Sequence, residues 1–221
     1  MNFKIILKND RNAFHKDPRV NKIVDSLLNE NTSLFEEIVN VINNIFHFNE
    51  FEDYIPSLIA LYDRSESNDK LGDYITFLWY IYKDNTNCGN LRGALLERLV
   101  YKLLEKKYVT DYESYISCYI CFNSWKSSKS IDVFFYVTTE EIGESIECKV
   151  NPFDFEKAHL DNLKDIFIRS NKKVYPSIIS FSSKNALELK IQEFKTPLGP
   201  IQLFGRENLK EIAEIRLRKS S

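Results

Sequence analysis

The chain has 221 residues, of which 43% are hydrophobic and 28% charged, and its formal net charge is −2. This composition predicts a globular protein of one large domain or two small ones. The sequence has no run of about 18 apolar residues, so we expect no membrane span, and its first residues hold too short an apolar stretch for a signal peptide. Four scattered cysteines do not form a disulfide framework, and we therefore expect a protein of the reducing cytoplasm.

Charge is unevenly distributed along the chain. Residues 1–85 carry 9 Lys and Arg against 14 Asp and Glu, whereas residues 86–221 carry 21 against 18. The polar segment KDNTNCGN separates the two parts, and we place a module boundary there. The second part has the charge of a domain that faces nucleic acid, although the imbalance is mild. The first part is expected either to bind a protein partner or regulate the second, or simply to cover its sheet.

The first part is predicted to be helical after a short opening strand. Apolar residues recur at intervals of three and four through four segments, residues 18–30, 31–48, 50–63 and 69–84. In the second segment Ser33 and Glu36 have the spacing of a capping box. In the third segment Pro56 limits or bends the helix.

From residue 90 the predicted order changes to helix, three strands, helix and strand. Runs rich in β-branched and aromatic residues indicate the strands, and a glycine turn precedes the third. A helix then crosses over to a buried strand, which predicts a mixed sheet covered on both faces. The segments are a helix at 90–108, strands at 114–125, 129–139 and 145–150, a helix at 153–170, a strand at 173–182, and a helix, strand and helix at 185–194, 200–205 and 207–217. The predicted fold class is α/β, an αβββαβ core with a mixed sheet preceded by an all-α module.

A glutamate of the long predicted helix lies in unusual surroundings. Glu97 lies away from the charged face of that helix, and its neighbours one or two turns away include Gly93, Val100 and Leu104. A carboxylate in an apolar row is costly unless a metal, a lysine or a hydrogen-bond network compensates it. The alternative is a boundary glutamate that reaches solvent at the rim of the helix.

Two neighbouring strands also carry charged residues that need an explanation. Asp132 interrupts the aromatic strand SIDVFFYV, where aspartate is disfavoured, unless it merely caps the preceding turn. In ESIECKV, Glu147 and Lys149 share a face because side chains alternate along a strand, although exposed sheets also carry such pairs. Neighbouring strands lie about 4.8 Å apart, so Asp132 and Glu147 can share one hard cation, with Lys149 beside them.

Together the segments GALLERLVYKLL, SIDVFFY and ESIECKV resemble the PD-(D/E)XK nuclease superfamily, the restriction-endonuclease-like fold. The resemblance covers roughly residues 90–205 and includes the order of the elements. It implies that Asp132 is the aspartate of the motif, that Glu147 and Lys149 are its acid-x-lysine, and that Glu97 is the helical glutamate of many members.

Two features depart from the pattern of the superfamily. Ile131 precedes the aspartate in place of proline, a position where the superfamily is loose. No Gln-x-x-x-Tyr follows Lys149 on the next helix, which disfavours the exonuclease branch found in recombination complexes.

The resemblance implies a metal-dependent endonuclease that hydrolyses the phosphodiester bonds of nucleic acid, with DNA as the expected substrate, and leaves a 5′ phosphate and a 3′ hydroxyl. Mg²⁺ or Mn²⁺ would be held by Asp132, Glu147 and the backbone carbonyl of Cys148, and would activate a water and neutralise the scissile phosphate. Glu97 would hold a second ion or a water of the first, and Lys149 would orient the attacking water. By analogy, a small nuclease with a helical module resembles restriction or phage-defence effectors.

A rival interpretation is a catalytically silent subunit that keeps the fold for nucleic-acid binding or complex assembly. Loss of at least one motif residue would be expected of such a subunit, and the motif here is nearly intact. A homodimer would supply the two active sites that cutting both strands needs, although no residue in the sequence marks an interface.

Other candidate sites are weaker. Cys118 and Cys121 have the C-x-x-C spacing, but residues three apart on a strand point to opposite faces, so core cysteines are predicted instead of a zinc or redox pair. His15, His47 and His159 are too dispersed in sequence for a histidine-metal nuclease or a catalytic triad. No phosphate-binding glycine loop is present, so ATP use is not expected.

Overall fold

The computed structural model of the chain describes residues 3–8, 12–62, 68–84, 86–109 and 111–215. Residues 64–67, between the third and fourth predicted helices, lie outside this part of the chain. The helices are α1 (Asn12–His15), α2 (Pro18–Leu27), α3 (Thr32–Asn44), α4 (Phe48–Tyr62), α5 (Asn68–Tyr82), α6 (Cys88–Lys107), α7 (Lys157–Arg169) and α8 (Lys184–Gln192), with 3₁₀ turns η2 (Pro152–Asp154) and η3 (Leu209–Ala213). The strands are β1 (Lys4–Leu7), β2 (Tyr112–Phe122), β3 (Trp125–Lys126), β4 (Ile131–Val137), β5 (Ile142–Lys149), β6 (Val174–Ser180) and β7 (Gln202–Phe204).

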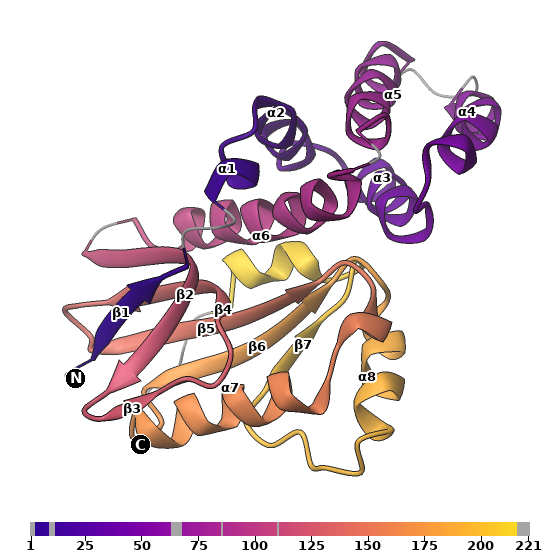
Figure 1. Cartoon of the computed structure of the whole chain (residues 1–221). Coiled ribbons are helices and arrows are strands. Elements are labelled where there is room, and N and C mark those ends of the chain that lie inside the picture. Colours follow the sequence, from indigo (N-terminus) through magenta and orange to yellow (C-terminus); the bar gives the residue numbers. More distant parts are fainter. Residues whose placement is uncertain (1–2, 9–11, 63–67, 85, 110, 216–221) are drawn as a thin grey trace.

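The strands form one mixed sheet in the order β1-β2-β4-β5-β6-β7, with β3 paired to β2. Neighbours from β1 to β5 are antiparallel, whereas β6 runs parallel to both β5 and β7. Figure 1 shows α6 along one face of the sheet, with α1 to α5 beyond it, and α7 on the opposite face. The predicted α/β class, with a mixed sheet between helices, is confirmed. None of the described helices is both long and apolar enough to cross a membrane.

Two apolar clusters cover the two faces of the sheet. Val133 and Phe135 of β4 pack into the cluster that contains α6 and the N-terminal helices. Phe134 and Tyr136, the alternate residues of the same strand, pack into the cluster that contains α7 and α8. This division follows from the period of two along a strand. Alternation thus sets the face of each residue from Val133 to Tyr136, whereas Ile131 at the start of β4 packs with Phe134 and Tyr136.

The N-terminal cap of α3 differs from the prediction. The side chain of Asn31 accepts a hydrogen bond from the backbone N–H of Leu34 at 2.9 Å and caps the helix, which begins at Thr32. Ser33 lies inside the first turn, so the capping box predicted for Ser33 and Glu36 is wrong. Asparagine caps a helix as well as serine does, and the earlier position adds residues to the helix.

The short opening strand predicted for the chain is β1, but it pairs with β2, so the first part is not an all-α module. Two other segments differ from their predictions. Gly143 lies within β5 and not in a turn, and a Cβ there would lie 2.8 Å from the carbonyl oxygen of Phe135, so the glycine serves close strand packing. The final predicted helix is the short 3₁₀ turn η3, and residues 216–221 lie outside the described part. A module boundary near residue 85 stays a prediction.

Arg92 of α6 joins the two parts of the chain. Its guanidinium donates hydrogen bonds to the carbonyl oxygen of Ile42 at 2.8 and 2.5 Å and to that of Asn43 at 3.2 Å. These carbonyls belong to the last turn of α3, where the helix dipole favours a positive charge. The ring of Phe46 lies 4.6 Å from the guanidinium carbon, and Arg92 is only 6% exposed.

We expect Arg92→Met to lower the free energy of unfolding by about 3 kcal/mol, because it leaves buried carbonyl oxygens without their charged donor. Urea denaturation measures this change. The exposed Arg169→Met is the matched control, and its effect should stay within about 0.5 kcal/mol. Equal effects of the two substitutions would contradict the linking role of Arg92.

Candidate active site

Asp132 lies where β4 and β5 separate. The antiparallel pairing of the two strands ends at Val133 and Ile146. Beyond that pair, the backbone N–H of Cys148 donates a hydrogen bond of 2.8 Å to Asp132 Oδ2, so a carboxylate takes the place of a backbone partner. Continuing the register would place Asp132 opposite Glu147. Asp132 is 4% exposed, and it therefore does more than cap the preceding turn.

Lys149 is shared by two buried carboxylates. Its ammonium donates to Glu147 Oε1 at 2.5 Å and lies 3.5 Å from Asp132 Oδ2. Glu147 is only 2% exposed. Its second oxygen, Oε2, is buried and receives no hydrogen bond from the described part of the chain. The three motif residues thus lie together at one point of the sheet.

The surroundings change the acidity of two of these groups. Burial and the neighbouring Asp132 raise the pKa of Glu147 to about 8, and Glu97 adds to this effect while Lys149 opposes it. Burial lowers the pKa of Lys149, but Asp132 and Glu147 outweigh burial and leave it raised. Lys149 is therefore a cation at neutral pH. A strongly shifted carboxyl beside a specific charge partner is typical of functional sites.

His159 of α7 faces Glu147. Its Nε2 lies 3.4 Å from Glu147 Oε1, while its Nδ1 accepts a hydrogen bond of 3.1 Å from the backbone N–H of Glu156. Because Nδ1 is an acceptor, the ring proton belongs on Nε2. Burial, together with Lys149 and Lys129, lowers the pKa of His159 to about 4. A neutral imidazole thus lies beside the Glu147 carboxylate.

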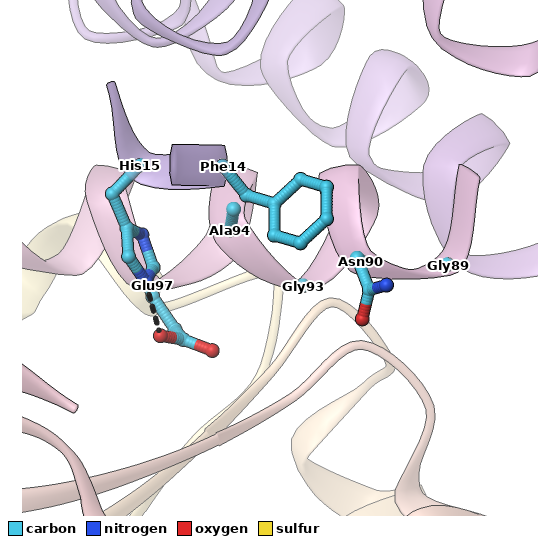
Figure 2. A pocket seen from close by; sticks show the side chains of 7 residues that line it. All are labelled: Phe14, His15, Gly89, Asn90, Gly93, Ala94 and Glu97. Carbon is cyan, nitrogen blue, oxygen red and sulfur yellow. Dashed lines mark ion pairs between the residues drawn. The ribbon is translucent and has the colours of Figure 1, made fainter. Parts of the chain in front are cut away.

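Glu97 of α6 lies between two hollows. It is 3% exposed, which confirms the burial predicted from its place on the helix. One hollow is a cleft of about 420 Å³ that Glu97 lines together with Lys149 and Asn151. The other is a cavity of about 70 Å³, in which His15 Nε2 lies 3.1 Å from Glu97 Oε2 (Figure 2). Glu97 acts on Glu147 electrostatically, and so belongs to the same site.

The donor set fits a hard divalent cation. Among the described residues, no three His, Cys, Asp or Glu side chains surround a point suited to a metal. Mg²⁺, however, is commonly bound by one or two carboxylates and completes its coordination with water. Asp132 and Glu147 already hold the ammonium of Lys149 between them, and the Oε2 atom of Glu147 offers a further acceptor. The carbonyl of Cys148 stays a predicted ligand.

Sequence reasoning missed two residues of this site. His15 and His159 each lie next to one of the predicted acids, although the histidines are far apart in sequence. The sequence does place His159 at the start of a helix, because it follows Glu156 by three residues, the spacing of a capping box.

Cys118 and Cys121 are free thiols, the first buried and the second half-buried, and Cys118 packs into the apolar cluster under α7.

Comparisons with known proteins identify the fold alone. No family model and no curated protein matches the chain. A solved structure, protein VC1899 from Vibrio cholerae, is similar with a TM-score of 0.53 and 12% sequence identity. The match covers 96% of this chain and 57% of VC1899, so the chain spans little more than half the length of that protein.

Proposed function

We propose that the protein is a metal-dependent endonuclease that hydrolyses phosphodiester bonds of nucleic acid, with DNA as its substrate. One observation carries the proposal: Asp132 and Glu147, both buried, share Lys149 where β4 and β5 separate. Paired carboxylates with an adjacent lysine supply the charges that phosphodiester hydrolysis requires. The resemblance to the PD-(D/E)XK superfamily supports the same assignment.

Each residue of the site has a separate task in this proposal. Asp132 and Glu147 would hold Mg²⁺ or Mn²⁺, with Glu97 beside them. The ion, when bound, supplies positive charge that neutralises the scissile phosphate. Lys149, whose side chain is 18% exposed, would orient the attacking water and donate to the phosphate oxygen that gains charge. His159, packed beside the Glu147 carboxylate, would limit its movement.

The cleft beside Lys149 is the proposed entry for substrate. It is open to solvent and lined by Lys149, Asn151 and Asp154 on one side and by α6 on the other. Arg92 also lines it, but its guanidinium is bound to α3 and is not available for a phosphate.

In the proposed reaction, water would add to phosphorus while the bond to O3′ breaks, leaving a 5′ phosphate. A role in restriction or phage defence is proposed by analogy only.

We expect the purified chain to nick supercoiled plasmid when Mg²⁺ or Mn²⁺ is present, and Lys149→Ala to reduce the nicking rate by about 100-fold or more, because a donor to the developing charge is lost. Agarose gels of nicked and linear products measure the rate. The exposed Lys157→Ala is the matched control and should nick like the parent.

Nicking that survives Lys149→Ala unchanged would contradict the proposed role of the lysine. If the parent binds DNA but cleaves neither DNA nor RNA with any divalent ion, the silent nuclease-fold subunit becomes the better assignment.

A further inference from the structure

The cavity between α1 and α6 has features that the nuclease motif does not explain. Its lining comes from Phe14 and His15 of α1 and from α6 residues that include Gly93 and Glu97. Figure 2 shows the His15 ring reaching from α1 down toward the Glu97 carboxylate. His15 is 7% exposed, so a polar side chain is buried here beside an acid.

His15 is close to Glu97 without being hydrogen-bonded. The distance from Nε2 to Glu97 Oε2 is 3.1 Å, yet neither ring nitrogen of His15 has a hydrogen-bond partner among the residues that the structure describes. A buried imidazole without hydrogen bonds is costly. The two atoms thus make a close contact, an ion pair when the imidazole is protonated, without the geometry of a hydrogen bond.

The distance between the two atoms suits a shared metal ion. Two adjacent ligands on an octahedral ion with bonds of about 2.1 Å lie about 3.0 Å apart, close to the separation of His15 Nε2 and Glu97 Oε2. The cavity of about 70 Å³ leaves space beside them. A Cβ atom built on Gly89 or Gly93 would meet nothing within 4 Å, so the glycines keep this space open. Water needs about 10–15 Å³ of such volume per molecule, and several can complete the coordination.

We propose that His15 and Glu97 form a second divalent-metal site, separate from the Asp132 and Glu147 pair, and that this site takes a first-row transition ion such as Mn²⁺. Imidazole suits first-row transition ions such as Fe²⁺ and Zn²⁺; Mn²⁺ favours oxygen ligands as Mg²⁺ does, but accepts an imidazole nitrogen more readily than Mg²⁺. The N-terminal segment would thus supply a ligand to Glu97, a residue that also lines the cleft with Lys149. The role in catalysis rests on the proposed nuclease function, but the metal site itself does not.

Counting bound Mn²⁺ tests this site directly. The full chain is freed of metal with a chelator, Mn²⁺ and a large excess of Mg²⁺ are added, and free Mn²⁺ is measured by electron paramagnetic resonance. We expect the parent to retain one Mn²⁺ per chain. His15→Gln and Glu97→Gln should weaken this binding by at least about 100-fold, and His47→Gln, which changes an exposed histidine, should retain it.

A second measurement needs no substitution at His15 to fold correctly. Pulsed electron paramagnetic resonance of Mn²⁺ bound to the parent should detect coupling to a directly bound imidazole nitrogen, and His159→Gln should keep this coupling. A parent that releases all its Mn²⁺ to Mg²⁺, or that lacks the nitrogen coupling, would overturn the site. If the protein retains Mn²⁺ but never nicks DNA, only the proposed nuclease function is contradicted. If it nicks DNA but does not retain Mn²⁺, only the metal site at His15 and Glu97 is contradicted.

Discussion

We expect Asp132→Asn and Glu147→Gln each to reduce cleavage by about 100- to 1000-fold, because each removes a carboxylate that holds the cation. Neither variant should melt below the metal-free parent. Glutamine at position 147 mimics the protonated acid, Asp132→Asn removes a charge that opposes ionisation of Glu147, and asparagine still offers an oxygen to the Cys148 N–H that bonds Asp132 at 2.8 Å. Nicking assays and thermal melting with a chelator present measure the two effects.

Divalent metal should raise the melting temperature of the parent much more than that of these two variants. At a metal concentration of about 100 times the dissociation constant, binding stabilises the native state by about 2.7 kcal/mol, which corresponds to a rise of roughly 5–10 °C in Tm for a chain of this size. The Asp132→Asn and Glu147→Gln variants should lose most of this rise. Glu188→Gln, on the exposed surface of α8, should show the full rise and normal cleavage.

The opposite result would change the assignment of the whole site. In this result, the melting temperature of the parent does not change with Mg²⁺ or Mn²⁺, while both variants melt well below the parent. In that case Asp132 and Glu147 are structural partners of Lys149. Breaking a buried ion pair costs about 3–5 kcal/mol, which the melting curves would show. The assignment of the fold would then remain, and the proposed nuclease function would be rejected.

Local patterns were enough to predict the framework of the site. The alternation in ESIECKV predicts that Glu147 and Lys149 share a face, and in the structure the Lys149 ammonium lies 2.5 Å from Glu147 Oε1. The helical period predicted that Glu97 is buried. Both predictions succeed because side-chain direction within a helix or strand is set by the backbone geometry alone.

Contacts between distant segments could not be predicted in this way. The pairing of β1 with β2 and the approach of His15 to Glu97 depend on how the chain returns to the same place. The spacing of residues within one element carries no information about such contacts. The sequence therefore gives no sign that two of the dispersed histidines contact the predicted acids. The start of α3 is also mispredicted because Asn31 and Ser33 are equally good N-cap residues, and the helix begins after the first of them.

The pH dependence of stability should identify the unusual carboxyl of the metal-free site. The pKa of Glu147 is raised to about 8, against an ordinary value near 4.5 in the unfolded chain. Between these values the folded state keeps a proton that the unfolded state releases, so stability is fully present below about 4.5 and is lost as pH rises through 8. The pKa of His159 is lowered to about 4, so its contribution is lost as pH falls below 6.5. The two effects therefore oppose each other in acid.

The window from pH 6.5 to 8 reports mainly on Glu147, since His159 is neutral in the folded state throughout and loses its remaining proton in the unfolded state just above pH 6.5. We expect the unfolding free energy of the parent in chelator to fall by about 1–2 kcal/mol across this window, because the limiting slope is about 1.4 kcal/mol per pH unit. Glu147→Gln, which mimics the protonated acid, should be flat, and Glu188→Gln should keep the slope of the parent. Urea denaturation at several pH values measures all three. A parent curve as flat as that of Glu147→Gln would mean that Lys149 compensates Glu147 fully, and that the site holds two ionised carboxylates before any metal binds.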